Sequence, residues 1–441
     1  MLRRAISAMR ARLVQGESGG VLRGMFVLAL GTGAARLIGL LTIPWLARIY
    51  TPEDYGVLAV YTALVATLAP ALTLRYVQAV PLPRTDAMAV NLLALCGALI
   101  VGTCILTALI IWLVSDVILL WMSMETLVPW KWLLLLGAAA LATYEAGTCW
   151  ATRKRAYSVI SRTKLLQSAA AELTKITLGL LGFKPIGLLL GSIVEQGGGT
   201  SAYAKRFGSD LRALAQEVRF ARIVRLLRFY RGFPLYRLPS QFLLALSTQA
   251  PAMLSAALYG AKSTGHLAFA LMALAIPGNL IGQSAGQAFY GEIARLPKGS
   301  SQRIQSLVYA VQKRLFLFGV PVTLFIILLG TELFVLVFGD EWRDAGVYAS
   351  ILAPFVLLQL TSAPLVQVLN VLNIQVAFLI INIVRAIGLL AIYLLCLNLE
   401  LGPKAFAAIL SGFLFLFYLL VTIYILATVR NLTIRSTEDS R

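Results

Sequence analysis

Long apolar runs separated by short polar segments dominate this sequence. Runs of about 18 or more mostly apolar residues recur about twelve times along the chain. They lie near 25–47, 57–80, 88–114, 132–151, 165–182, 186–200, 239–259, 266–290, 315–337, 345–370, 374–397 and 404–428. The runs are continuously apolar rather than alternating, which indicates transmembrane helices and not barrel strands. We therefore expect an all-α, multi-pass membrane protein.

The composition agrees with this pattern. Hydrophobic residues make up 59% of the 441 residues and charged residues 13%, with a mean hydropathy of +0.83. A soluble domain carries roughly 25% charged residues. The bilayer is the natural environment for so apolar a chain.

The basic residues concentrate on one side of the predicted membrane. The net charge is +19, and with a cytoplasmic N-terminus the inside segments hold 29 Lys and Arg against six in the outside loops. This asymmetry follows the positive-inside rule and predicts that both termini are cytoplasmic. Topology and contact with anionic phospholipid headgroups account for the basicity, so we expect no nucleic-acid partner.

The segment 201–237 is the longest polar interruption and carries nine Lys and Arg. Part of it is predicted to lie on the inner membrane surface as an amphipathic helix. Its apolar positions recur at helical spacing: Leu211, Leu214, Val218, Ala221 and Val224. About six spans precede this segment and about six follow it, which predicts two bundles related by a parallel repeat. The expected organisation is a basic N-terminus at 1–24, a first six-helix bundle at 25–200, the linker at 201–237, a second six-helix bundle at 238–429 and a tail at 430–441.

A short internal similarity supports the repeat. "YGVLAVY" at 55–61 follows the first span of one half, and "TGHLAFA" at 264–270 follows the first span of the other. The two glycines at the start of these stretches are Gly56 and Gly265.

Charged residues inside the predicted spans are the candidate functional residues. A charge near the bilayer centre costs about 2.5–3.5 kcal/mol on insertion scales, so such residues tend to face a partner or a water-filled cavity. The basic ones are Arg36, Lys175 and Arg385, with Arg75 near the inner end of a span. The acidic ones are Glu145 and Glu172, with Glu195 near the end of its span.

Some of these charges have partners in reach. Glu172 and Lys175 are three residues apart and share a helix face, so they can neutralise each other, and Glu145 can pair with a basic neighbour or, like Glu172, take part in coupling. We expect Arg36 and Arg385, one in each half, to line a central cavity that receives an anionic group. Lys175 and Arg75 are further candidates, and hydrogen bonding between helices or snorkelling towards the interface is the alternative for each.

The first span also carries a small-residue strip. In "ALGTGAARLIGLL" (29–41), Gly31, Ala35 and Gly39 recur every four residues, which predicts close approach of another helix. Arg36 projects beside this strip.

The sequence contains no group of residues that indicates an enzyme rather than a transporter. The single histidine, His266, lies at the outer end of a predicted span, so we expect neither a Ser/His/Asp arrangement nor a zinc site, and no phosphate-binding glycine loop is present. We expect no enzymatic activity and no cofactor, and the sequence leaves open whether an ion or a proton drives transport.

Several stretches, in order along the chain, resemble the Wzx-type O-antigen and polysaccharide flippases. This family belongs to the multidrug/oligosaccharidyl-lipid/polysaccharide (MOP) exporter superfamily, which also holds the MATE transporters. The stretches are "RIYTPEDYGVLAVY" (48–61), "TLRYVQAVPLPRTDAMAVNLLAL" (73–95), "ATRKRAYSVISRTKLLQS" (151–168), "FKPIGLLLGSI" (183–193), "GFPLYRLPSQFLLALSTQAPAMLSAALYG" (232–260), "LAIPGNLIGQSAGQAFYGEI" (274–293) and "LFVLVFGDEWRDAGVYASILAP" (333–354).

The resemblance implies a twelve-helix fold in the bacterial inner membrane. It also implies that an undecaprenyl-pyrophosphate-linked oligosaccharide moves from the cytoplasmic to the periplasmic leaflet by alternating access, for O-antigen, capsule or exopolysaccharide synthesis. A glycan polymerase and other assembly proteins are the partners it implies. The family's cationic cavity would correspond to Arg36, Lys175 and Arg385, whereas 201–237 has no matching role. Two alternatives remain open: a drug or cation antiporter of the same superfamily, and a non-transporting scaffold of a glycan-assembly complex.

Overall fold

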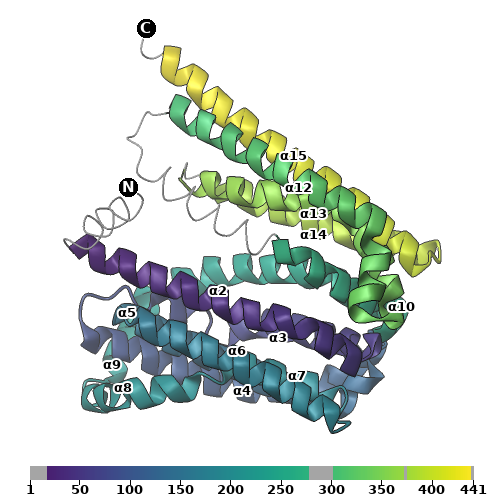
Figure 1. Ribbon diagram of the computed structural model, residues 1–441. Coiled ribbons are helices and arrows are strands. Elements are labelled where there is room, and N and C mark those ends of the chain that lie inside the picture. The colour runs from purple at the N-terminus through teal and green to yellow at the C-terminus, as the bar shows by residue number, and fades with distance from the viewer. Residues whose placement is uncertain (1–16, 278–300, 372–374, 439–441) are drawn as a thin grey trace, which may run out of the picture. The chain divides into compact units, whose positions relative to one another are not determined.

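The computed structural model describes residues 17–277, 301–371 and 375–438, and these residues form helices joined by short connections (Figure 1). Nine helical segments within these ranges are long and apolar enough to cross a membrane. The chain is therefore an all-α, multi-pass membrane protein, as its apolar runs predict. The exact number of twelve spans stays a prediction.

In chain order, the first half contains α2 (Glu17–Ile49), α3 (Pro52–Leu72), η1 (Tyr76–Ala79), α4 (Asp86–Trp121), η2 (Glu125–Trp130), α5 (Trp132–Arg153), α6 (Tyr157–Leu180), α7 (Ile186–Gly197), α8 (Thr200–Ala215) and α9 (Phe220–Phe229). The second half contains η3 (Phe233–Arg237), α10 (Leu238–Pro277), α12 (Ser301–Phe338), η5 (Asp340–Trp342), α13 (Arg343–Val371), α14 (Gln375–Asn398) and α15 (Pro403–Glu438).

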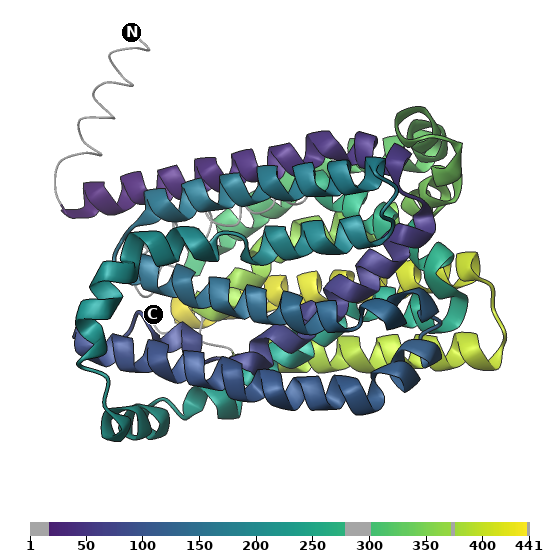
Figure 2. The same cartoon turned by 90° about the horizontal axis from the view of Figure 1, so that it is seen from below.

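The chain divides into two compact units. Unit 1 comprises Met1–Tyr50, Tyr61–Leu120 and Glu125–Phe242, and unit 2 comprises Thr51–Val60, Trp121–Met124 and Leu243–Arg441. In unit 1, α6 packs between α2 and α7, and both views show α2 and α6 side by side (Figures 1 and 2). In unit 2, α12, α13 and α15 pack on one another.

The start of α3 explains why this helix begins where it does. The Thr51 backbone N–H donates to the Asp54 carboxylate at 2.9 Å, and the Asp54 N–H donates back to the Thr51 hydroxyl at 3.3 Å. This reciprocal pair is a capping box, and Pro52 occupies the first helical position, where its missing N–H costs nothing. The sequence "TPED" (51–54) thus fixes the turn between α2 and α3.

Helix α10 contains the break that the sequence predicts between its two apolar runs at 239–259 and 266–290. Gly260 has φ 74° and ψ −173°, which is not helical and is accessible to glycine because it lacks a Cβ. Helix α10 therefore consists of two helices that meet at a kink at Gly260. The rest of the second run, residues 278–290, lies outside the described residues.

Other expected boundaries are wrong. The span predicted at 57–80 ends at Leu72, and residues 76–79 form the separate turn η1. The helix predicted from 315 already begins at Ser301, because the basic segment before it continues the helix rather than forming a loop. Helix α4 likewise extends to Trp121, beyond its expected end at 114, which shortens the expected outer loop.

Candidate functional site

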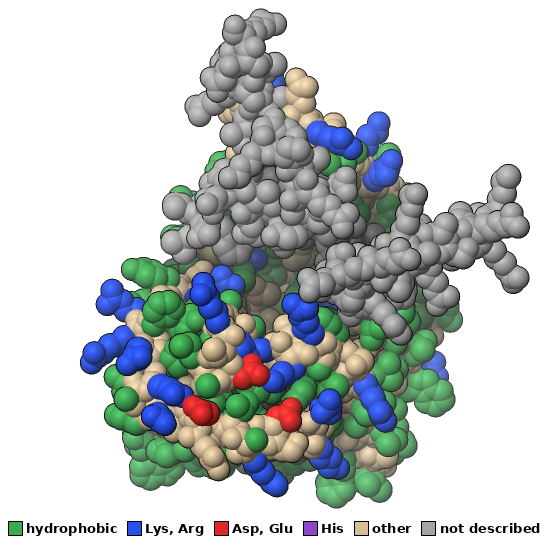
Figure 3. Space-filling model, turned by 90° about the vertical axis from the view of Figure 1, so that its left-hand side faces the viewer, with side chains coloured by type: hydrophobic (Ala, Val, Ile, Leu, Met, Phe, Trp, Pro, Cys, Tyr) green, Lys and Arg blue, Asp and Glu red, His purple; other side chains and the backbone are tan. Residues whose placement is uncertain are grey.

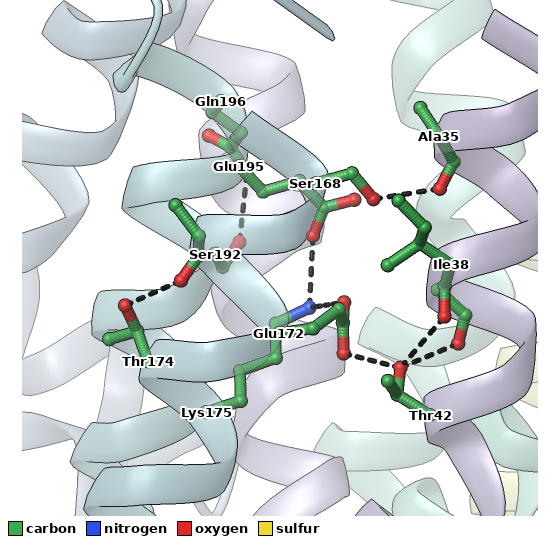
Figure 4. Close-up of polar contacts among 12 residues, drawn as sticks. Ala35, Ile38, Thr42, Ser168, Glu172, Thr174, Lys175, Ser192, Glu195 and Gln196 are labelled. Carbon is green, nitrogen blue, oxygen red and sulfur yellow. Dashed lines mark hydrogen bonds and ion pairs between the residues drawn. The ribbon is translucent and has the colours of Figure 1, made fainter. Parts of the chain in front are cut away.

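The small-residue strip of α2 packs directly on α6. The hydroxyl of Ser161 donates to the Val27 carbonyl at 3.0 Å, and that of Ser168 donates to the Ala35 carbonyl at 2.7 Å (Figure 4). A Cβ at Gly31 would collide with Ser161. The predicted close approach of a second helix is therefore confirmed, and the partner helix is α6.

Lys175 lies at the centre of a buried charge cluster beside this contact. Its Nζ lies 2.8 Å from Glu172 Oε1 and 3.0 Å from Glu195 Oε2 (Figure 4). Thr42 of α2 donates its hydroxyl to the other oxygen of Glu172 at 2.7 Å. Three helices, α2, α6 and α7, thus meet at one cluster of charges and hydroxyls.

The cluster carries more negative than positive charge. Two carboxylates share one ammonium, and only the side chain of Glu195 is largely exposed, at 53%. Because the charge of Lys175 is balanced here, the structure favours a role for Lys175 in joining α6 to α7. Its expected role in binding an anion stays a prediction with less support.

Arg36 lies on α2 within the stretch that faces α6, and it is half-buried. Its positive charge acts on Lys164 of α6, so two cations from different helices lie near one another. Cations held close together raise the local positive potential, which favours an anion. This arrangement supports the cavity prediction for Arg36 without testing it.

Arg75 pairs with Glu145, as the sequence allows. Its Nη1 lies 3.0 Å from Glu145 Oε1 on α5, and its Nη2 donates to Gln241 Oε1 at the start of α10 at 3.1 Å. Its backbone is left-handed, with φ 62°, which is uncommon for a residue with a side chain. Arg75 is thus a fixed cation that ties two helices to the connection after α3.

Arg385 of α14 has a different environment. Its guanidinium donates to three hydroxyls: Ser247 at 2.6 Å, Thr248 at 3.1 Å and Tyr418 at 3.4 Å. None of the ion pairs found among the described residues includes Arg385. Its Nε is buried and, within the same residues, has no hydrogen-bond partner. Among the described residues, Arg385 is therefore a cation held in place by neutral hydroxyl groups and not by an acidic partner.

The sequence prediction names neither the hydroxyl partners of Arg385 nor Thr42 as site residues. Ser247 and Thr248 are adjacent polar residues within an apolar run, and this interruption is the sequence feature that could have indicated them as site residues. The sequence places Glu195 only as a charge near the end of its span. Their contacts join helices far apart in sequence, so spacing alone does not reveal them.

The fold is shared with solved transporters. The chain aligns with an inward-facing multidrug resistance MATE family transporter of the MOP superfamily over 96% of this chain and 98% of that chain, with a TM-score of 0.61 and 14% identity. It aligns with the lipid II flippase MurJ over 93% and 91%, with a TM-score of 0.60 and 12% identity. A MOP superfamily transporter from Pyrococcus furiosus, described as having a binding pocket of reversed polarity, matches with a TM-score of 0.54 and 13% identity over 96% and 98%. No curated protein matches the chain significantly in sequence.

The fold is the one found in transporters of the MOP superfamily, here in a multi-pass membrane protein. The family model of the polysaccharide biosynthesis proteins matches residues 45–347, which is more than half of the chain. The chain therefore belongs to the polysaccharide biosynthesis protein family, in agreement with the resemblance found in its sequence.

Proposed function

We propose that this protein moves a lipid-linked oligosaccharide, carried on undecaprenyl pyrophosphate, from the cytoplasmic to the periplasmic leaflet of a bacterial inner membrane. The observation that carries the proposal is the guanidinium of Arg385, which hydroxyl groups hold without an acidic partner among the described residues, in a member of the polysaccharide biosynthesis family. A pyrophosphate brings the negative charge and the acceptor oxygens that this guanidinium lacks. The polyprenyl chain would remain in the lipid.

The surroundings of Arg385 suit a transient anion better than a permanent one. Hydroxyl groups orient the guanidinium without neutralising it, and Thr248 is exposed. Alternating access needs a site that binds the substrate and then releases it. An arginine held by hydroxyls meets both requirements, because its partners do not compete with the substrate through charge.

Complementation tests the proposal directly. A strain that lacks its polysaccharide flippase would receive this gene, and surface glycan and the cytoplasmic pool of the lipid-linked precursor would be measured. Restored surface glycan with a reduced precursor pool is expected. Arg385→Ala should lower the rate of glycan export about tenfold or more, because a hydrogen bond to a charged group of the substrate is lost. Arg385→Lys keeps the positive charge and should retain part of the export rate.

Arg343→Ala is the matched control, because Arg343 is an exposed arginine of unit 2 that pairs with Asp340. It should leave glycan export unchanged. Full export by Arg385→Ala would overturn the anion-binding role and would favour the non-transporting scaffold. A strain with normal glycan after deletion of the gene, and with no second flippase, would overturn the proposal itself.

A drug or cation antiporter is the second candidate, and one observation favours it. The cluster of Glu172, Lys175 and Glu195 has an excess of negative charge, which suits a cation. Efflux of a cationic dye from cells that express the protein, together with failure to restore glycan, would support this candidate.

A further inference from the structure

The segment around α9 has an arginine at every third position, from Arg219 to Arg231. Apolar or aromatic pairs separate most of these arginines, as in "RFARIVRLLRFYR" (219–231). A step of three residues turns by about 300° in an α-helix. Within α9, Arg222, Arg225 and Arg228 therefore spread over about 120° of the helix surface, and Arg219 and Arg231 flank the helix.

Helix α9 is fixed to the ends of membrane-spanning helices. The Arg219 backbone N–H donates to the Asn91 side chain of α4 at 2.9 Å, and Asn91 donates to the Glu217 carbonyl at 2.9 Å. The Tyr76 hydroxyl of η1, between the spans α3 and α4, donates to the Leu227 carbonyl at 2.9 Å. These contacts place α9 where two spans leave the membrane, which is the level of the lipid headgroups.

Three of the five residues in the apolar stripe that the sequence assigns to the membrane face the protein instead, whereas Ala221 of the same stripe is exposed. Leu211, Leu214 and Val218 pack on a buried cluster of unit 1 that includes Tyr203 and Leu226. The stripe is also interrupted, because α8 ends at Ala215 and α9 begins at Phe220. The expectation that this face lies on the lipid is therefore wrong for Leu211, Leu214 and Val218.

A second apolar surface remains open. Phe220 is 81% exposed and Leu227 is 40% exposed. Their spacing of seven residues puts them on one flank of α9, about 100° from the buried Leu226. Phe229 and Tyr236 are 76% and 77% exposed nearby in sequence. Aromatic side chains beside arginines are typical of helices that lie in the membrane interface.

Almost no acidic charge offsets the arginines. Glu217 is the only Asp or Glu in 211–237, and it pairs with Arg222 at 2.7 Å. The Arg222 guanidinium holds the pKa of Glu217 below its ordinary value, so the carboxylate remains charged and occupied. Arg225, Arg228 and Arg231 are exposed. Lys and Arg side chains gather on the face of the molecule at the end where α8 and α9 lie, with few acidic ones among them (Figure 3).

We propose that α9 is a binding site for anionic phospholipid headgroups. Phe220 and Leu227 insert among the lipids at the edge of the bilayer, while Arg225, Arg228 and Arg231 contact the headgroup phosphates. The site is independent of the transported substrate, because it lies on the outside of unit 1 and uses none of the intramembrane charges. It anchors α9 to the leaflet that the charge distribution assigns to the cytoplasm.

Native mass spectrometry of the full chain tests this site. The purified protein would be released from nanodiscs that contain equal amounts of phosphatidylglycerol and phosphatidylcholine, and the retained lipids would be counted. The native protein should retain phosphatidylglycerol preferentially. The triple variant Arg225→Gln/Arg228→Gln/Arg231→Gln should lose about fivefold or more of this preference, since each arginine contributes to attraction of an anionic surface.

The variant Lys262→Gln/Arg343→Gln/Lys404→Gln is the matched control, because it removes the same charge from exposed positions of unit 2. It should retain the native preference. A third variant, Phe220→Ser/Leu227→Ser, keeps all the arginines and should lower the total number of retained lipids. Thermal unfolding in detergent shows whether each variant is folded.

Two results would overturn the proposal. One is equal retention of the two lipids by the native protein. The other is an unchanged preference in a folded triple variant. Binding of an acidic protein to α9, without a preference for phosphatidylglycerol over phosphatidylcholine, would also overturn it.

Discussion

Gly56 of α3 and Gly265 of α10 lie against each other in a contact that has local two-fold symmetry. A Cβ at Gly56 would collide with the carbonyl of Ala261, and a Cβ at Gly265 would collide with the carbonyl of Pro52. Each obstructing residue lies four positions before the opposite glycine. The two similar stretches "YGVLAVY" and "TGHLAFA" therefore pack on one another, with equivalent residues in equivalent roles.

This contact predicts that alanine is poorly tolerated at either glycine. Gly56→Ala and Gly265→Ala should each destabilise the protein by about 1–3 kcal/mol, because a backbone carbonyl cannot move aside as a flexible side chain does. The measurement is the melting temperature of the purified protein in detergent. Gly97→Ala is the control: Gly97 is an exposed helical residue with no atom within 4 Å of an added Cβ. A melting temperature for Gly56→Ala equal to that of Gly97→Ala would contradict the prediction.

The cluster around Lys175 predicts an asymmetric response to mutation. Lys175→Met leaves the buried Glu172 without its cation and should cost about 3 kcal/mol or more. The double variant Glu172→Gln/Lys175→Met removes both buried charges and should recover most of that loss. Glu195→Gln changes a half-exposed group and should cost less than about 1 kcal/mol. If the double variant melted as low as Lys175→Met, the loss would come from packing and not from charge.

Three helices end with a left-handed residue, and at two of these positions we expect glycine to stabilise the protein. Helices α5, α6 and α14 end in the same pattern, in which a backbone N–H reaches five residues back: Ala156 to Ala151, Phe183 to Leu178 and Leu401 to Cys396. The residue before each donor is left-handed, and it is Gly182 in α6 but Arg155 in α5 and Glu400 in α14. Glu400→Gly and Arg155→Gly should each stabilise the protein by about 1 kcal/mol, because glycine avoids the steric cost of a Cβ in this conformation.

The control for these substitutions uses alanine. Glu400→Ala removes the same charge but keeps a Cβ, so it should leave the melting temperature nearly unchanged. Gly182→Ala should lower it. A rise with Glu400→Ala equal to that with Glu400→Gly would show that the charge, and not the backbone, was responsible.

Charge reversal at Arg36 tests its predicted role in receiving an anionic group. Because Arg36 and Lys164 lie near one another, Arg36→Glu should replace local attraction of an anion with repulsion and reduce glycan export about tenfold or more. Arg48→Glu, at the exposed end of the same helix, is the matched control and should be nearly neutral. Normal glycan export in the Arg36→Glu strain would show that Arg36 does not receive the anionic group.

The helices of this fold are largely predictable because the membrane leaves few other options for apolar runs. The break at Gly260 also follows from sequence, since the polar stretch 260–265 interrupts two apolar runs. The pairing of Glu172 with Lys175 is local and could be read from their spacing. The contacts of Thr42 and Glu195 with this pair depend on how α2 and α7 pack on α6. The spacing of residues along one helix does not reveal that packing.

The apolar face of the 201–237 segment shows a different limit. A stripe such as Leu211, Leu214 and Val218 indicates that a helix buries one side, but protein and lipid are both apolar partners. The pattern therefore could not distinguish packing on unit 1 from contact with the bilayer. For Arg385, the sequence located the charge but not the three hydroxyls that hold it.

The polarity of α6 has a consequence for how the protein is made. The described helices that are long and apolar enough to cross a membrane do not include α6, which carries Lys164, Glu172 and Lys175. Each intramembrane charge costs about 2.5–3.5 kcal/mol in a helix inserted alone. Thr42, made earlier in α2, and Glu195, made later in α7, are the groups that offset this cost. We therefore expect α6 and α7 to insert into the bilayer together during biosynthesis, against an α2 that is already there.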